Sequence, residues 1–509
     1  MACRPFVQVL LPFAAAYFLS YVFRTINGLL ARTLTQELSL SAAELGLLTS
    51  VSFLAMAMVQ LPLGVLFDRY GPRRVQSACL LFAAAGAGIF ACAGGLPGLM
   101  LGRALIGVGV ATAFMSSLKA IVLWFPKERI AFANGWVMML GALGAVTATV
   151  PAEPVVNELG WRGFFAFLAA ATALSAAIIF LVVPEPTTRA AAAPLARVSL
   201  RDIYMDMRFL RLAPLSTLSI GTAWSLQGLW AAPWLEHVEG LDRDGVVRHL
   251  LFIGIALSVG AILLGWTADR FRRRGIGREE YYAVIALLFV AAQMMLILHV
   301  PVPSFIPWAI IAAVGAATVV SFAVLPEYFP KEMSGRANAA LNILHLSGAF
   351  ALQYLTGVIV SCWPPISGHP PAEAYEAAFG FSVILQLLAL LWFLGSTRLA
   401  RIPRFSASRR PAWQTSPSEA RSREYAIAGL AIASHIAAAR AQVAHWRLIG
   451  IASATLCASL VTLTVLRAQS GPVVHVIEMS SLVAVEDDRH PQDARLVMVS
   501  VTGALRRER

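Results

Sequence analysis

The chain has 509 residues, of which 58% are hydrophobic and 13% are charged, and its mean hydropathy is +0.71. This composition excludes a water-soluble fold and predicts an all-α protein that crosses a membrane many times. The net charge is +12. Lys and Arg nevertheless stand in short clusters between apolar runs, without the continuous basic face that a nucleic-acid partner requires.

Twelve apolar runs are long enough to cross about 30 Å of hydrocarbon, which takes about 20 helical residues. The first run follows Arg4 and lacks the small-residue cleavage site of a signal peptide, so we expect it to be a transmembrane helix. A polar stretch at 184–211 separates six runs from six more. The predicted spans are 6–31, 43–66, 75–94, 98–123, 132–152, 162–183, 212–235, 248–268, 281–299, 303–325, 336–361 and 376–395.

The distribution of Lys and Arg predicts the orientation of these spans. With a cytoplasmic N-terminus, most of the Lys and Arg clusters fall on the cytoplasmic side, whereas the outer loops receive only Arg32, Arg162, Arg243 and Arg248. Cytoplasmic loops of membrane proteins collect positive charge. We therefore expect a multi-pass protein of the inner (plasma) membrane with its N-terminus in the cytoplasm.

The two halves of the chain repeat each other. GVLFDRYGPRR at 64–74 is echoed by GWTADRFRRR at 265–274, and FPKERIAFAN at 125–134 is echoed by FPKEMSGRAN at 329–338. Two echoes at nearly the same offset indicate a duplicated six-helix unit. The predicted parts are a bundle at 1–183, a cytoplasmic linker at 184–211 and a second bundle at 212–397.

These motifs resemble those of the major facilitator superfamily of transporters, over residues 1 to about 400. The resemblance implies a fold of twelve helices in two six-helix repeats, with alternating access to a central site. In the second copy of the first motif, Arg272 stands where the family has glycine. The matching residues are Gly64, Asp68, Arg69, Gly71, Arg73 and Arg74 in the first motif, Gly265, Asp269 and Arg270 in its copy, and Arg103, Gly107 and Gly109 in an R-x-x-x-G-x-G pattern of the fourth span.

The first motif is expected to form a contact at the cytoplasmic rim that holds the inner side closed in one state. Gly64 would let two helices approach closely, Asp68 would cap a helix or pair with an arginine, and Gly71 with Pro72 would turn the chain. The simpler alternative is a hairpin loop that carries positive-inside charge. Duplication of the motif favours a contact between bundles that closes the inner side in the outward-open state.

Arg24 in the first span is the main candidate for substrate binding. A guanidinium group matches the geometry of a carboxylate or phosphate, and Asn27 beside it extends a polar patch. The alternative is an arginine that snorkels to lipid headgroups. Organophosphate and organic-anion porters of the superfamily also carry this arginine. They often place a second one in the seventh span, which this chain lacks.

Further candidates come from the fourth, seventh and eleventh spans. Asn342 and His345 lie on one face of a helix that also carries Asn338, and such a face should point to a cavity. His345 is either a site of proton coupling or a neutral histidine hydrogen-bonded to another helix. From the seventh span, Gln227 and Trp230 are expected to line the cavity. Arg103 is expected to have a structural or coupling role.

A central cation without a central carboxylate favours an organic anion or a zwitterion as substrate. We therefore predict a secondary active transporter of a small solute that works as a monomer by alternating access. An ion gradient or exchange would drive it, and a proton is one candidate for the coupling ion. No catalytic motif, metal site or cofactor site is indicated. Instead of the G-x-x-x-G-P signature typical of drug antiporters, the fifth span carries GALGAVTATVP. The alternative is a receptor or scaffold that kept the fold without transporting.

The C-terminal region predicts three further segments: a basic cytoplasmic stretch at 398–445, a thirteenth span at 446–467 and an extracytoplasmic tail at 468–509. This region resembles the N-terminal anchor of VirB8/TrbF-like conjugation proteins. The residues that match are Tyr425, Trp446, Arg447, Pro472, Val473 and Val474. The tail is shorter than the periplasmic domain of that family, so the resemblance assigns no secretion function.

Overall fold

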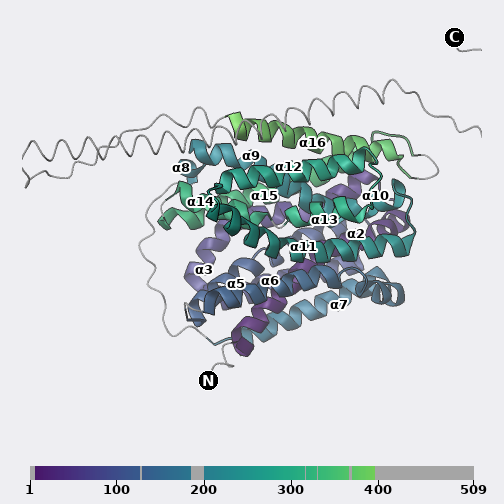
Figure 1. The fold of residues 1–509 in the computed structure, drawn as a ribbon. Coiled ribbons are helices and arrows are strands. Elements are labelled where there is room, and N and C mark those ends of the chain that lie inside the picture. Colours follow the sequence, from purple (N-terminus) through teal and green to yellow (C-terminus); the bar gives the residue numbers. More distant parts are fainter. Residues whose placement is uncertain are drawn as a thin grey trace, which may run out of the picture. The chain divides into compact units, whose positions relative to one another are not determined.

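The computed structural model describes residues 6–126, 129–184, 200–315, 317–329, 331–365 and 369–395, which form helices joined by short connections (Figure 1). The predicted C-terminal segments 398–445, 446–467 and 468–509 lie outside these residues, and so does the resemblance to conjugation proteins.

The first half contains the predicted six spans. Spans two and three form one continuous element that bends between them, and span four is divided in two. The elements are η1 (Phe6–Leu10), α2 (Leu11–Leu38), α3 (Ala42–Cys92), α4 (Leu96–Val110), α5 (Ala113–Trp124), α6 (Ile130–Thr147) and α7 (Ala152–Val182), where η denotes a π-helical turn.

The second half repeats this pattern after a short helix within the predicted linker. Its first span begins at Met207, earlier than the predicted residue 212, and it is interrupted by a π-helical turn. The elements are α8 (Leu200–Tyr204), α9 (Met207–Ser225), η3 (Leu226–Trp230), α10 (Ala231–His237), α11 (Arg243–Arg273), α12 (Arg278–Ile297), α13 (Phe305–Gly315), α14 (Thr318–Tyr328), α15 (Lys331–Val360) and α16 (Ala372–Gly395).

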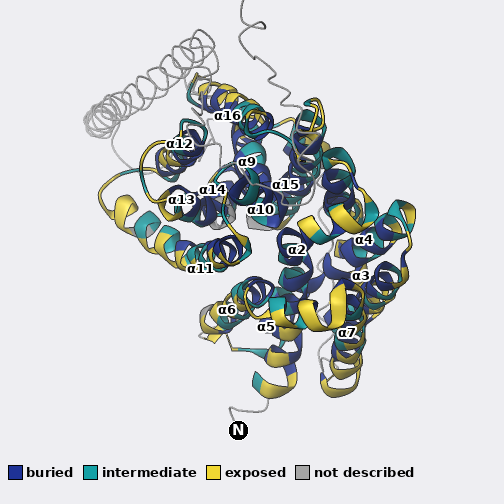
Figure 2. Cartoon of the chain, turned by 90° about the vertical axis from the view of Figure 1, so that its right-hand side faces the viewer, coloured by how far each residue is buried: buried dark blue, intermediate teal, exposed yellow. Residues whose placement is uncertain are grey.

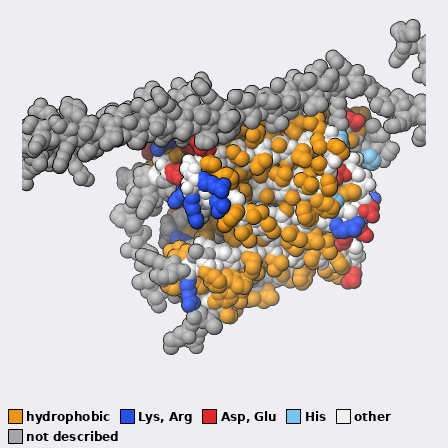
Figure 3. Space-filling view, viewed as in Figure 1, with side chains coloured by type: hydrophobic (Ala, Val, Ile, Leu, Met, Phe, Trp, Pro, Cys, Tyr) orange, Lys and Arg blue, Asp and Glu red, His pale blue; other side chains and the backbone are white. Residues whose placement is uncertain are grey.

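In the described part of the chain, ten helices are long and apolar enough to cross a membrane. The other two predicted spans are the shorter apolar helix Phe132–Thr147 and the segment of α9, η3 and α10. That segment is rich in Ser and Thr and is largely buried, so it needs little apolar surface toward lipid. Hydrophobic side chains form a broad band across the molecule, with charged ones gathered toward its ends (Figure 3). The predicted all-helical membrane fold is confirmed, and these two segments lie where the remaining two of the twelve spans were predicted.

Local sequence explains where α3 begins and where it bends. Ser41 and Glu44 form a capping box, in which the Ser41 Oγ accepts a hydrogen bond from the Glu44 amide at 3.2 Å and the Glu44 carboxylate accepts from the Ser41 amide at 2.8 Å. The bend falls at Gly71, whose φ is +76°. Residues other than glycine rarely adopt this conformation, so the predicted turn at Gly71 is confirmed.

The two halves form separate bundles that meet along a few helices. Figure 2 shows α2–α7 on one side and α9–α16 on the other. The first half meets the second through α2, α3 and α6, which contact η3, α10, α11 and α15. The largest apolar cores lie mainly within single halves. This arrangement allows one bundle to rotate against the other without disrupting either core.

Several contacts between the halves lie at the end of the molecule opposite the 64–74 motif. The Gln353 amide donates to the Thr49 hydroxyl at 2.6 Å, and the Ala43 amide donates to the Ser361 hydroxyl at 2.9 Å. Nearby, the Arg243 guanidinium pairs with the Glu153 carboxylate at 2.8 Å. These contacts hold the halves together at this end, which we call the sealed end.

Within the first half, α6 packs tightly against α2 through two glycines. A Cβ atom at Gly144 would lie 2.3 Å from the backbone oxygen of Phe18, and one at Gly141 would lie 2.5 Å from the Tyr17 ring. Small residues allow membrane helices to approach this closely. The GALG sequence of the fifth span is therefore a packing surface for the first span.

We expect Gly144→Val to reduce the thermal stability of the purified protein, because overpacking costs about 1–3 kcal/mol and the backbone of α2 cannot rotate out of the way. Gly135→Val on the same helix is the matched control, since no described atom outside its own helical turn lies within 4 Å of its Cβ position. The midpoint of thermal unfolding measures both. Equal midpoints for the two variants would contradict this account of the packing.

Candidate functional site

A cavity of about 840 Å³ lies between the two halves and is lined by both. Its lining includes Arg24 from α2, Trp224 from α9 and Ile262 from α11. It extends to Gly135 in the first turns of α6, toward the end of the molecule that carries the 64–74 motif. The cavity therefore begins near the middle of the spans and runs away from the sealed end.

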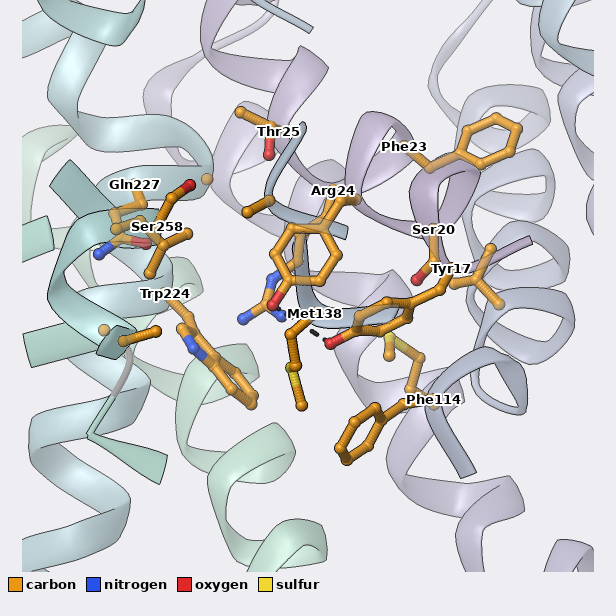
Figure 4. A pocket seen from close by; sticks show the side chains of 18 of the residues that line it. Tyr17, Ser20, Phe23, Arg24, Thr25, Phe114, Met138, Trp224, Gln227 and Ser258 are labelled. Atoms are coloured by element: carbon orange, nitrogen blue, oxygen red, sulfur yellow. Dashed lines mark hydrogen bonds between the residues drawn. The ribbon is translucent and has the colours of Figure 1, made fainter. Parts of the chain in front are cut away.

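Arg24 lies at the meeting point of the halves. Its guanidinium carbon is 3.8 Å from the centre of the Trp224 ring and 5.3 Å from that of Phe53. In Figure 4, Arg24 and Trp224 come from different helices and approach each other in the cavity. The Arg24 Nη2 atom is buried and has no hydrogen-bond partner among the described residues. A guanidinium held on one face by an aromatic ring keeps its edge available for an anion.

The charge of the cavity is positive. Among its described lining residues, Arg24 and Arg103 are cationic and none is acidic. Arg103 donates a hydrogen bond from Nη1 to the Phe23 carbonyl at 3.1 Å, and its guanidinium lies 4.7 Å from the Phe90 ring centre. Arg103 therefore contacts the backbone of α2 next to Arg24. A cavity lined in this way attracts anions and repels cations.

The seventh span brings Gln227 to the cavity through an irregular turn. Gln227 lies in η3, and π-helical turns are frequent at functional sites. Its side-chain amide donates to the backbone oxygens of Ile311 and Ala312 at 3.3 and 3.2 Å. Trp230, at the end of η3, is 1% exposed and donates to the Gln353 carbonyl at 3.1 Å. Trp230 thus packs behind the cavity, whereas Gln227 lines it.

The polar face of the eleventh span is divided between the cavity and the interior of the second half. Asn342 lines the cavity. His345 is fully buried, and its Nε2 atom lies 2.7 Å from the Ser216 hydroxyl. The His345 ring contacts the edge of Trp224, with 6.2 Å between ring centres. His345 therefore touches the ring that stacks on Arg24 without lining the cavity itself.

Asn27 lies one helical turn beyond Arg24 and is buried. Its side-chain amide donates to the Arg24 carbonyl at 3.1 Å, and it is not among the residues that line the cavity. Asn27 is therefore placed to fix the helix at Arg24.

The 64–74 motif lies away from this cavity. Arg73 donates from Nε and Nη2 to the Phe180 carbonyl at 2.9 and 2.5 Å, which joins α3 to the end of α7. Among the described residues outside the glycine's own helical turn, no atom lies within 4 Å of a Cβ position at Gly64 or Gly265. The expected close helix approach at Gly64 belongs to the state in which the inner side is closed, and it stays a prediction. Of the other arginines of the motif and its copy, Arg69 lies near the Tyr70 ring and Arg270 near the Trp266 ring, and Arg74 has contacts of its own. The Asp68 and Asp269 side chains are outside the described part.

The glycines of the fourth span allow close packing. A Cβ at Gly107 would lie 2.4 Å from the Ser52 backbone oxygen, and one at Gly109 would lie 2.4 Å from the backbone nitrogen of Ala83. Both positions bring the fourth span against α3. This packing supports the helix that carries Arg103.

Comparison with known proteins agrees with this architecture. Residues 13–352 match the Major Facilitator Superfamily profile. The probable sulfoacetate transporter SauU of Cupriavidus necator is 24% identical over 298 residues, 55% of this chain and 69% of that protein. The gentisate transporter of Corynebacterium glutamicum is 24% identical over 384 residues, 72% of this chain and 82% of that protein. A bacterial homolog of the human lysosomal transporter Spinster, solved in an inward-facing and occupied conformation, gives a TM-score of 0.63 at 20% identity and covers 77% of this chain and 96% of that one.

Two helical bundles around a cavity lined from both halves define a secondary transporter of small solutes that works by alternating access. Because the matching profile covers more than half of the chain, the protein belongs to the Major Facilitator Superfamily. It is a transporter and not an enzyme, and the receptor or scaffold alternative is not supported.

Proposed function

We propose that this protein transports a small organic anion and that Arg24 binds the charge of its substrate. The cavity carries this proposal, because its lining includes the partly exposed Arg24 and no described acidic residue. A charged side chain near the middle of a membrane costs about 2.5–3.5 kcal/mol on insertion scales. An anionic ligand would offset this cost by pairing with the guanidinium edge.

The names of two relatives support an anionic substrate. Sulfoacetate and gentisate both carry negative charge at neutral pH. This chain matches 69% and 82% of the length of the two proteins that are named for their transport. Zwitterions, the other class favoured by the sequence, would bring a cationic group that pairs best with a carboxylate. Since the described lining has none, the proposal is restricted to anions.

The proposed topology places the N-terminus and the 64–74 motif in the cytoplasm, at the inner membrane of the cell. The sealed end would then face outward, and the structure would correspond to an inward-facing state of a transporter that works as a monomer. Between states, the two bundles at 1–183 and 212–397 would rotate about the cavity, with the 184–211 segment as their linker. The 64–74 motif and its copy would close the inner side in the opposite state.

We propose His345 as the site for a coupling proton, because it is a titratable side chain in contact with the Trp224 ring that touches Arg24. His345→Gln is expected to abolish uptake driven by a proton gradient and to preserve substrate exchange, which requires no net proton movement. Both activities can be followed in the same proteoliposomes. Gradient-driven uptake at the wild-type rate would remove His345 from coupling.

Uptake into proteoliposomes tests the proposed function. Radiolabelled carboxylates and sulfonates of different size are compared with their neutral amides and with cationic amines of similar shape. We expect uptake above that of protein-free liposomes for at least one anion and for none of the neutral or cationic solutes. Uptake of an amine, or of an amide at the rate of its acid, would contradict the proposal.

A further inference from the structure

We propose that the substrate is a monoanion built on an aromatic ring, such as an aromatic carboxylate or sulfonate. This inference rests on the proposed function, since it takes Arg24 as the anion site. The inference goes beyond the proposed function in two respects: the number of charges on the substrate and the chemistry of its uncharged part. Both follow from side chains that surround Arg24.

Within the described lining of the cavity, one cation is accessible. Arg24 lines the cavity and is partly exposed, although its Nη2 atom is buried and lacks a partner in the described structure. Arg103 is only 1% exposed, because the Phe90 and Phe165 rings lie at 4.7 and 5.2 Å from its guanidinium. A ligand can therefore reach the edge of Arg24 but not Arg103. A second carboxylate would enter an apolar space without a counter-charge.

The space beside Arg24 is walled by aromatic rings and thioethers. Tyr17 and Phe114 stack with 5.4 Å between ring centres, and Met138 lies between them and Trp224 (Figure 4). Aromatic rings pair well with other rings, and methionine sulfur makes favourable contacts with ring edges. These four side chains form a slot suited to a flat ring whose acidic group reaches Arg24.

Apolar side chains form most of the lining of this cavity, and part of its polar groups already bond the protein backbone. The Gln227 amide already donates to two backbone oxygens of α13. The Ser52 and Ser258 hydroxyls likewise donate to backbone oxygens of their own helices. The other polar lining side chains stand at scattered places: Tyr17, Ser20, Tyr21, Thr25, Gln60 and Asn342. Burying several hydroxyl groups without partners is unfavourable, so this lining disfavours polyhydroxylated acids. An inorganic anion as small as nitrate would leave most of the cavity of about 840 Å³ unfilled.

Isothermal titration of the purified full-length protein with four acids tests this inference. The ligands are benzoate, cyclohexanecarboxylate, phthalate and gluconate. We expect benzoate to bind at least threefold more tightly than cyclohexanecarboxylate, because aromatic contacts add to the area buried. Benzoate should also bind at least tenfold more tightly than phthalate and gluconate.

A variant pair locates the slot. Phe114→Leu is expected to weaken benzoate binding about fivefold, whereas Phe132→Leu on the exposed surface of α6 should leave it unchanged, since Phe132 is 61% exposed. If gluconate or phthalate binds as tightly as benzoate and loses its affinity in Arg24→Gln, the inference that the substrate is an aromatic monoanion is wrong. The proposed function would stand in that case. Absence of binding by every anion tested here, together with no anion uptake, would overturn both. Equal effects of the two phenylalanine variants would overturn the slot.

Discussion

Replacement of Arg24 with glutamine should lower the apparent affinity for the transported anion by at least about 30-fold, while the protein remains folded. Losing one member of a buried charge pair costs about 2 kcal/mol or more in binding, and 1.4 kcal/mol corresponds to tenfold. Arg24 has no acidic partner in the described structure, so its removal leaves no unpaired carboxylate. Concentration-dependent uptake and the midpoint of thermal unfolding measure the two effects.

Two further variants show whether the charge of Arg24 or the geometry of its guanidinium matters, and whether losing any arginine lowers transport. Arg24→Lys keeps the charge but loses the flat guanidinium that stacks on Trp224 at 3.8 Å, so it should transport more slowly than wild type. Arg248→Gln is the matched control, because Arg248 is exposed and, among the described residues, donates to a backbone oxygen of its own helix at 3.2 Å. Wild-type affinity in Arg24→Gln would remove Arg24 from the substrate site.

Arg243→Gln should shift the protein toward the state in which the sealed end is open. The Arg243 guanidinium pairs with Glu153 and also donates to the Leu29 carbonyl at 3.2 Å, so one side chain of the second half binds two helices of the first. Loss of such a coupling is worth about 1–3 kcal/mol, or about five- to 150-fold in the equilibrium between states. Spin labels at Leu159 and Val300, which are 56% and 38% exposed, would report a longer distance across this end.

The pair between Arg32 and Glu236 provides the control for this experiment. It also joins the halves, at 3.3 Å, but the Arg32 side chain is 51% exposed. Exposed ion pairs contribute about 0–1 kcal/mol, so Arg32→Gln should change the distance distribution less than Arg243→Gln. The labels require replacement of the five native cysteines. Unchanged distributions in Arg243→Gln would show that this contact does not hold the sealed end.

The helices were predictable from the sequence because a membrane imposes a length on apolar runs. The seventh span is the exception, because its helix is interrupted by a π-helical turn between α9 and α10. Its π-helical turn at Gln227 has no signal in hydropathy. The start of the second bundle at Met207 was also missed, because the polar residues that precede Leu212 resemble a linker.

The candidate site was predictable in part. Arg24, Gln227 and Asn342 were predicted from polar residues within apolar runs, and all three line the cavity; their role in binding stays a prediction. Periodicity shows which face of a helix is polar, but not which neighbouring helix covers it. For this reason His345 and Trp230 were expected in the cavity, whereas the structure buries them behind it.

The largest omission was Trp224, which contacts Arg24 across 200 positions of the chain. A tryptophan in an apolar run serves equally as a cavity wall or as an interface anchor, so sequence alone could not select it. The same holds for the bond between Arg103 and the Phe23 carbonyl. Backbone acceptors leave no mark in a sequence, and Arg103 was expected only to have a structural or coupling role.

Binding of one acid and its amide to wild type and to Arg24→Gln tests the central claim most directly. The ligands are the carboxylate that is taken up best by proteoliposomes and its carboxamide, and titration calorimetry gives the four affinities of a double-mutant cycle. We predict that wild type prefers the carboxylate by at least about tenfold and that Arg24→Gln shows no preference. A preference for the carboxylate that persists in Arg24→Gln would contradict the account.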